Sequence, residues 1–219
     1  MIGHRFIRFA RFVPSAHLPA TRITVARRIV QVAVPGLFLL LTACGGNMED
    51  PRIELNPHPT MRYKITVTIA DAPGPFDNIE ASVDYGVTDF DCVPEQPISG
   101  ARLLPRKHVE LTLSKLSETT YVTEMYADLF KDDDYYSLGT CHWSVAALTL
   151  NATKERMRFT TPLTFKKFSA EGGETRYYSF ESYRDSSLET HNLGNTDRNG
   201  YRNAAGTFAI NVTARKAQP

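Results

Sequence analysis

Hydrophobic residues recur at every second position over much of the chain. In residues 63–69, Tyr63, Ile65, Val67 and Ile69 alternate with lysine and threonine, as in a strand with one buried and one wet face. Alternation, or a β-branched and aromatic composition, marks seven further segments: 79–85, 109–114, 120–130, 141–150, 156–160, 175–183 and 207–213. No window of helical length has a 3.6-residue apolar stripe, so the pattern predicts an all-β domain.

Short strands that bury one face need a second sheet to cover that face. We therefore expect residues 61–219 to form a single antiparallel β-sandwich, with an immunoglobulin-like topology as the first interpretation. Immunoglobulin domains place a tyrosine two residues before their second cysteine. Here that position is Gly139, so the strand order stays open.

The first 43 residues differ from the rest of the chain. Six arginines and no acidic residue precede Cys44, and the stretch 25–41 (VARRIVQVAVPGLFLLL) places two of those arginines before an apolar run. The run is typical of the h-region of a secretory signal and is shorter than the ~20 residues that span a bilayer. Pro35-Gly36 would also break a spanning helix.

The apolar run ends in Leu41-Thr42-Ala43-Cys44, which resembles a lipobox, the signal peptidase II site of bacterial lipoproteins. The resemblance covers only the leader. It implies cleavage before Cys44, a diacylglyceryl thioether on the cysteine sulfur and an acyl chain, such as palmitate, on the new amine. Gly45 and Gly46 follow in place of the aspartate that tends to retain such proteins in the inner membrane, so the resemblance implies an outer-membrane anchor. In the alternative interpretation Cys44 is merely a small residue that ends an ordinary signal peptide or a buried helix.

These features divide the chain into three parts. Residues 1–43 form a leader, residues 44–60 a lipidated N-terminus and flexible linker, and residues 61–219 the sandwich domain. The linker contains three prolines and shows little periodicity. Because Val25 would be an ordinary start if read from a GTG codon, we hypothesise that residues 1–24 are a gene-start artefact; an uncleaved precursor that begins at Met1 would refute this.

Two cysteines remain in the exported part, Cys92 and Cys141. In an oxidising compartment such a pair predicts one disulfide. Trp143 lies two residues after Cys141, hence on the same face of a strand, and is expected to pack near the bridge. A free Cys141 thiol with His142 as its base is disfavoured, because adjacent strand residues point to opposite faces.

The net charge of +1 conceals an asymmetry along the chain. From Cys44 onward there are 19 basic and 24 acidic residues, a net charge of −5. A mildly acidic body gives no electrostatic reason to expect a nucleic acid partner or docking on anionic lipid headgroups. The membrane contact that we expect is the lipid on Cys44 alone.

Motifs of catalysis and metal binding are missing. The sequence has no G-x-S-x-G, H-E-x-x-H, S-x-x-K or C-x-x-C motif and no glycine-rich phosphate loop. Asp132-Asp133-Asp134, just after Asp128, is the best candidate for a hard-cation site, but Tyr136 occupies the third ligand place of an EF-hand and no glycine follows it. We therefore expect no enzyme, no cofactor and no bound metal.

Two regions remain as candidates for contact with a partner. The acidic run and the following Tyr135 combine exposed acids with an aromatic ring, as in a protein-contact surface; alternatively the tyrosine packs on the core. Residues 182–206 are polar, rich in asparagine and glycine and long for a connection within a compact domain, which is typical of functional or disordered loops. Arg184, His191 and Arg202 are the candidate contact residues there.

Three functional classes fit these features. The first is an envelope lipoprotein that binds another envelope protein from the periplasmic face of the outer membrane, as an assembly factor or an immunity-type protein. The second is a glycan or small-ligand binder that uses the aromatic residues Tyr177, Tyr178, Phe180 and Tyr183. The third is an envelope hydrolase, for which the sequence shows no site. We favour the first.

Overall fold

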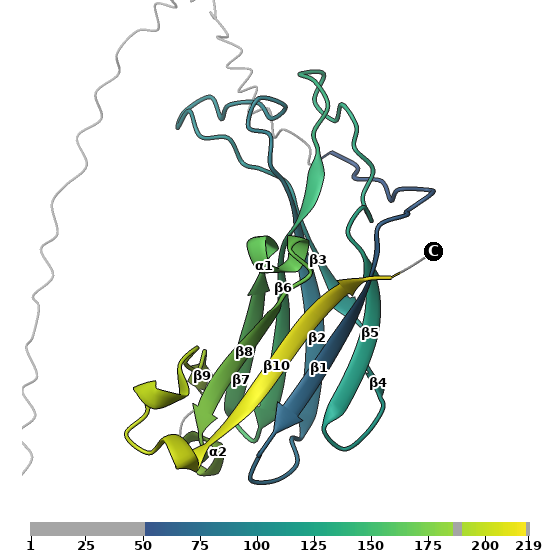
Figure 1. Ribbon diagram of the computed structural model, residues 1–219. Coiled ribbons are helices and arrows are strands. Elements are labelled where there is room, and N and C mark those ends of the chain that lie inside the picture. Colours follow the sequence, from purple (N-terminus) through teal and green to yellow (C-terminus); the bar gives the residue numbers. More distant parts are fainter. Residues whose placement is uncertain (1–50, 186–189, 218–219) are drawn as a thin grey trace, which may run out of the picture. The chain divides into compact units, whose positions relative to one another are not determined.

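Two five-stranded sheets pack face to face in the computed structural model, which describes residues 51–185 and 190–217. The first sheet has the order β4-β5-β1-β10-β8 and the second the order β3-β2-β6-β7-β9 (Figure 1). The first sheet comprises β1 (Arg62–Ala70), β4 (Ser114–Lys115), β5 (Thr120–Tyr126), β8 (Gly173–Ser179) and β10 (Thr207–Lys216). The second comprises β2 (Asn78–Val87), β3 (Arg106–Leu111), β6 (Trp143–Lys154), β7 (Met157–Thr164) and β9 (Thr190–Asn192).

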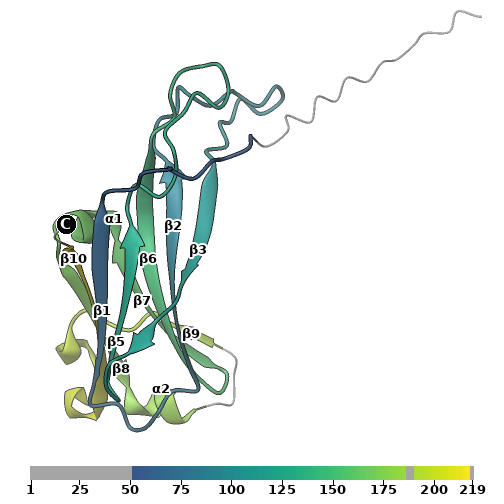
Figure 2. The ribbon, with the colours of Figure 1, turned by 90° about the vertical axis from the view of Figure 1, so that its right-hand side faces the viewer.

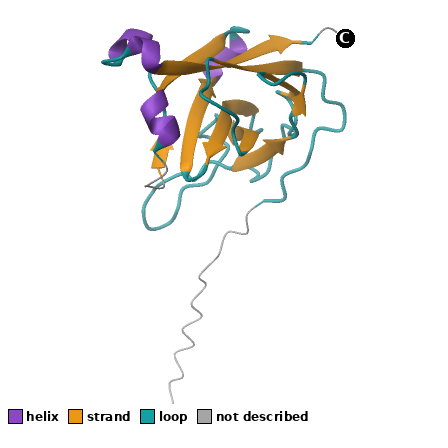
Figure 3. Cartoon of the chain, turned by 90° about the horizontal axis from the view of Figure 1, so that it is seen from below, coloured by secondary structure: helices purple, strands orange, loops and turns teal. Residues whose placement is uncertain are grey.

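Four short helical segments accompany the strands in the described residues. They are α1 (Phe165–Ser169), α2 (Phe180–Arg184) and two 3₁₀ turns, η1 (Arg198–Gly200) and η2 (Ala204–Gly206). Strands clearly dominate the view from below in Figure 3. Within the part of the chain that the structure describes, no helix has the length and hydrophobicity needed to cross a membrane.

The buried faces of the sheets are those that the alternation predicts. In β1, Ile65, Val67 and Ile69 are buried, whereas the threonines between them lie on the outer face. The register places Ile65 opposite Ala214 and Val67 opposite Val212 of β10, so the two strands bury their side chains on the same side. The predicted antiparallel sandwich is confirmed; among the described strands, β9 alone pairs in parallel, with β7.

The strand order differs from that of an immunoglobulin constant domain, in which the first and last strands lie in different sheets. Here β1 and β10 are antiparallel neighbours inside one sheet. The chain passes between the sheets several times, for example from β7 through α1 to β8. The sequence left this order open, and the pairing resolves it.

An aromatic cluster fills the core near the lower end of the strands. The ring centroid of Phe159 lies 5.2 Å from those of both Tyr178 and Phe208. Phe76 and Tyr183 complete the cluster, and the Tyr183 hydroxyl donates to the Pro75 carbonyl at 2.6 Å. Three of the four aromatics considered for a glycan platform, Tyr178, Phe180 and Tyr183, therefore lie in the core or pack against it.

Some predicted boundaries were wrong. The strand expected over residues 175–183 ends at Ser179, whose hydroxyl accepts the backbone N–H of Ser182 and caps α2. The strand expected over residues 120–130 ends at Tyr126. The region 182–206, expected as a long loop, contains the end of α2, all of β9 and both 3₁₀ turns.

The connections gather at two opposite ends of the sandwich. The loops 88–105 and 127–142, which follow β2 and β5, extend together beyond the upper end in Figures 1 and 2, where the described chain also begins. The β1–β2 turn and the segment from α2 to η2 lie at the lower end. The two candidate regions of the sequence therefore lie at opposite ends of the domain.

Candidate functional site

The loops 88–105 and 127–142 form one structural unit, here called the stapled tip. The disulfide between Cys92 and Cys141 joins them, with a Cα–Cα distance of 5.3 Å. The predicted disulfide is thus confirmed. Trp143 lies close by, where its ring packs against Phe130 with centroids 5.1 Å apart, as expected from its place on the face of Cys141.

The first loop of the tip is folded on itself. The backbone N–H of Gln96 donates to the Ala101 carbonyl at 2.8 Å, and that of Gly100 donates to the Gln96 carbonyl at 2.9 Å. Gly100 has φ +66°, a left-handed conformation that glycine adopts without strain. These bonds form a tight turn with Ile98 at its apex.

One arginine fixes the base of that turn. The Arg102 guanidinium donates to the Phe90 carbonyl at 2.7 Å and to the Asp91 carboxylate at 2.9 Å. It also lies 3.3 Å from the Glu95 carboxylate. Because a guanidinium offers several donors in a rigid plane, a single side chain ties three points of the loop together.

The acidic run organises the second loop. Asp132 accepts the backbone N–H of Trp143 at 2.8 Å, and its other oxygen lies 2.8 Å from the ring Nδ1 of His142. The Asp132 carboxylate accepts the ring N–H of His142 and thereby raises the pKa of that imidazole. Asp134 accepts the backbone N–H groups of Leu138 and Gly139 at 3.0 and 3.2 Å.

Asp133 and Tyr135 face Lys131. The Lys131 ammonium donates to Asp133 at 2.5 Å and lowers the pKa of that carboxyl. The Tyr135 hydroxyl donates to the Lys131 carbonyl at 2.5 Å, and its ring packs against the core. The three aspartates thus make separate contacts. Among the described residues, no group of three His, Cys, Asp or Glu side chains is arranged to hold a metal ion.

Asp128 attaches the beginning of the described chain to the tip. Its carboxylate accepts the backbone N–H groups of Thr60 and Met61 at 2.8 and 2.9 Å. Partial desolvation opposes ionisation of Asp128, but these bonds outweigh it and lower its pKa. The backbone N–H of Lys131 also donates to the Glu54 carbonyl, and that of Asn56 donates to the Leu129 carbonyl. Together these bonds make the second half of the expected linker part of the folded domain.

Large apolar side chains are exposed on this tightly bonded scaffold. Ile98 at the apex of the turn is fully exposed, and Leu103, Phe90 and Leu138 are 66%, 61% and 52% exposed. Burial of these side chains would be favourable, because it removes apolar area from water. Here the disulfide, Arg102 and the aspartates hold the loops out in solvent.

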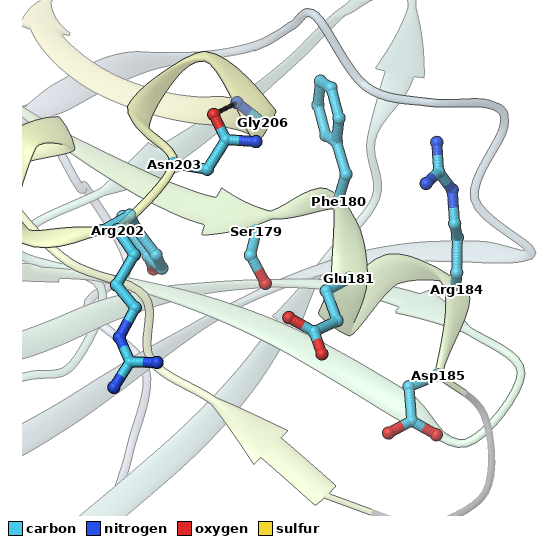
Figure 4. A pocket seen from close by; sticks show the side chains of 9 residues that line it. Ser179, Phe180, Glu181, Arg184, Asp185, Arg202, Asn203 and Gly206 are labelled. Atoms are coloured by element: carbon cyan, nitrogen blue, oxygen red, sulfur yellow. Dashed lines mark hydrogen bonds between the residues drawn. The ribbon is translucent and has the colours of Figure 1, made fainter.

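The other candidate residues lie at the opposite end of the sandwich. Arg184 and Arg202 line a pocket of about 720 Å³ between α2 and η2, together with Phe180 and Glu181. Figure 4 shows the two guanidinium groups on opposite sides of the pocket, directed away from each other. They are therefore not arranged to grip one anion. His191 is exposed in β9, where it pairs with Arg158 of β7, and does not line the pocket.

The predicted contact residues thus fall into two separate groups. The acidic run and Tyr135 belong to the stapled tip, whereas Arg184, His191 and Arg202 lie at the other end and form no single constellation. The sequence analysis missed the four exposed apolar residues of the tip. Pro97-Ile98-Ser99-Gly100, an apolar residue inside a turn sequence, was the signal that could have revealed one of them.

Comparison with protein-family models, with curated proteins and with solved structures finds no match to this chain. The candidate lipidation residue Cys44 lies outside the described residues. Function is therefore inferred from the leader sequence and from the geometry of the tip.

Proposed function

We propose that this protein is an envelope lipoprotein that is anchored through Cys44 to the periplasmic face of the outer membrane and binds another envelope protein. In this proposal it is a binding module without a cofactor and not an enzyme. The lipobox-like segment Leu41-Thr42-Ala43-Cys44 supports the anchor. A lipid anchor with several acyl chains binds a membrane durably, whereas one chain binds only marginally.

The single observation that carries the binding function is the exposure of large apolar side chains on the cross-linked loops of the tip. Proteins that bind with preformed loops lose less conformational entropy on association than proteins with mobile loops. Apolar side chains that a cross-linked scaffold exposes to water are unfavourable in free energy in the free protein. Burial in an interface removes this unfavourable term. The stapled tip combines both properties, whereas the pocket at the other end has neither convergent charges nor exposed large apolar side chains directed into it.

The anchor constrains where the partner is met. Cys44 precedes Pro51, the first described residue, by seven positions, and seven extended residues span at most about 25 Å. Pro51 lies beside the tip, because it lines one pocket together with Leu103 and Leu104 of the first loop. A lipidated Cys44 therefore favours a partner that meets the tip near the membrane surface.

The glycan-binding alternative has less support. Tyr178 is fully buried and Tyr183 packs in the aromatic cluster. Tyr177, on the other face of β8, lies under the Arg198 guanidinium, 5.3 Å from its ring centroid. Few of the aromatics proposed for a sugar platform thus present an open ring face.

The anchor is tested by metabolic labelling with palmitate. Wild-type protein is expected to incorporate label and to fractionate with the outer membrane, and the Cys44→Ser variant is expected to lose both properties. Wild-type protein that stays unlabelled, or a variant that fractionates as wild type does, would refute the anchor.

The binding function is tested by photo-crosslinking in intact cells. A photoreactive phenylalanine analogue is placed at Ile98, and in a matched strain at Leu116, which is 64% exposed in the turn between β4 and β5, outside the tip. We expect a discrete protein adduct from position 98 and none from position 116. Absence of an adduct at position 98, or equal adducts from both positions, would contradict the assignment of the tip.

A further inference from the structure

The acidic surplus of the chain is concentrated in the stapled tip. Its two loops contain seven carboxylates, one lysine, one arginine and His142, a net charge of −5 with histidine counted as neutral. This equals the net charge of all residues from Cys44 onward, so the remainder of that part is balanced, with 17 acidic and 17 basic residues. The carboxylates are Asp89, Asp91, Glu95, Asp128, Asp132, Asp133 and Asp134.

The cations of the tip do not neutralise it locally. Arg102 is shared by Asp91 and Glu95. Lys131 is shared by Asp133 and by Glu54, which lies 3.6 Å away. Each cation thus faces two carboxylates, and the Asp91 side chain is fully exposed, so uncompensated negative charge faces the solvent.

The apolar residues lie among these carboxylates in the chain. Phe90 stands between Asp89 and Asp91, and Leu138 donates its backbone N–H to Asp134. Apolar anchors surrounded by a polar, solvent-accessible rim are the usual composition of a protein–protein interface. A bilayer is a poorer match, because anionic lipid headgroups repel an acidic surface.

We infer that the tip is a docking surface for a protein whose own surface is basic and surrounds an apolar pocket for Ile98. The inference rests on the proposed protein-binding function and adds the chemistry of the partner. Opposite charges across such an interface accelerate association and exclude acidic competitors, whereas the apolar contacts supply most of the affinity.

The test removes charge without changing side-chain size. The double substitution Asp91→Asn with Glu95→Gln is introduced into the strain with the photoreactive residue at position 98. The matched control, Glu118→Gln with Glu124→Gln, removes two carboxylates outside the tip. We expect the tip variant to reduce adduct yield about fivefold, as for the loss of two rim charges, and the control to leave the yield unchanged.

A second measurement avoids any effect of the substitutions on the loop held by Arg102. In permeabilised cells with the unsubstituted tip, salt should weaken adduct formation, since the screening length falls from about 10 Å at 0.1 M to about 3 Å at 1 M. The crosslinked peptide, identified by mass spectrometry, should belong to a partner surface with an excess of lysine and arginine.

The outcomes separate this inference from the proposed function. If the yield of protein adduct changes neither on charge removal nor at high salt, or if the crosslinked surface is acidic, the inference of a basic partner is wrong. The proposed protein-binding function would still stand. Adducts with lipid alone would overturn both the basic partner and the protein-binding function. Loss of palmitate label would bear on the anchor only.

Discussion

Asp132 and His142 close the second loop of the tip, with the carboxylate Oδ2 2.8 Å from the imidazole Nδ1. The same carboxylate accepts the backbone N–H of Trp143, at the start of β6. One side chain thus connects the acidic run to the strand that carries the sole tryptophan. Since imidazole changes its charge near neutral pH, this contact makes the stability of the tip depend on pH.

The direction of that dependence follows from the raised pKa of His142. A pKa that is higher in the folded state than in the unfolded state stabilises the protein fully below the unfolded value, here about 6.5. The contribution disappears as the pH rises through the folded value. We compare the melting temperature of wild type with that of His142→Gln at each pH. We expect the difference, wild type minus variant, to decrease as the pH is raised from 5.5 to 8.5. A difference that stays constant over this range would show that the contact is not charge-dependent.

The disulfide should contribute strongly to stability. It closes a loop with a sequence separation of 49 residues, which corresponds to about 4 kcal/mol in the chain-entropy model. We expect the double variant Cys92→Ser, Cys141→Ser to unfold at a much lower urea concentration than wild type. Reduction of the wild-type protein is the control and should give the same midpoint as the double variant. An unchanged midpoint would mean that the other bonds of the tip suffice.

Asp128 should hold the segment 54–61 against the domain. Replacement by alanine removes the acceptor of two backbone N–H groups, with an expected loss of about 1 kcal/mol. We expect limited proteolysis of Asp128→Ala to cut within residues 54–61 much faster than in wild type. Asp128→Asn keeps one carbonyl acceptor and should be protected to an intermediate degree. Equal cleavage of all three proteins would show that the bridge between Leu55 and Phe130 holds the segment without Asp128.

The sheets were predictable because each strand buries one face. The alternation of Ile65, Val67 and Ile69 identifies β1, since the two-residue period of a strand places these side chains together. Phe180 was assigned to a strand because aromatic residues favour strands. Ser179, which caps a short helix at that point, outweighed that preference, and helices of five residues leave no periodic pattern to detect.

The sequence revealed the acidic residues of the candidate site but not its exposed apolar residues. The acidic run drew attention to residues 132–134, but a run of carboxylates does not reveal that Asp132 and Asp134 hold loop backbone. Exposure of Ile98 and Leu103 depends on loop geometry, which a linear pattern of apolar residues does not encode. A count of charges for each segment would have found the acidic surplus of the tip, because it needs no structure.

A substitution at Ile98 should weaken binding of the partner without changing the stability of the fold. Its side chain is fully exposed at the apex of the turn, so Ile98→Ser removes no core contact and should change the free energy of unfolding by less than about 0.5 kcal/mol. If the tip docks through this residue, loss of a central apolar anchor should weaken the complex by about 2 kcal/mol, roughly a thirtyfold rise in Kd. Isothermal titration with the partner identified by crosslinking measures the second effect, and urea unfolding measures the first. Leu116→Ser, the same kind of change outside the tip, should alter neither quantity. A partner that binds Ile98→Ser as tightly as wild type would show that the apex of the turn lies outside the interface.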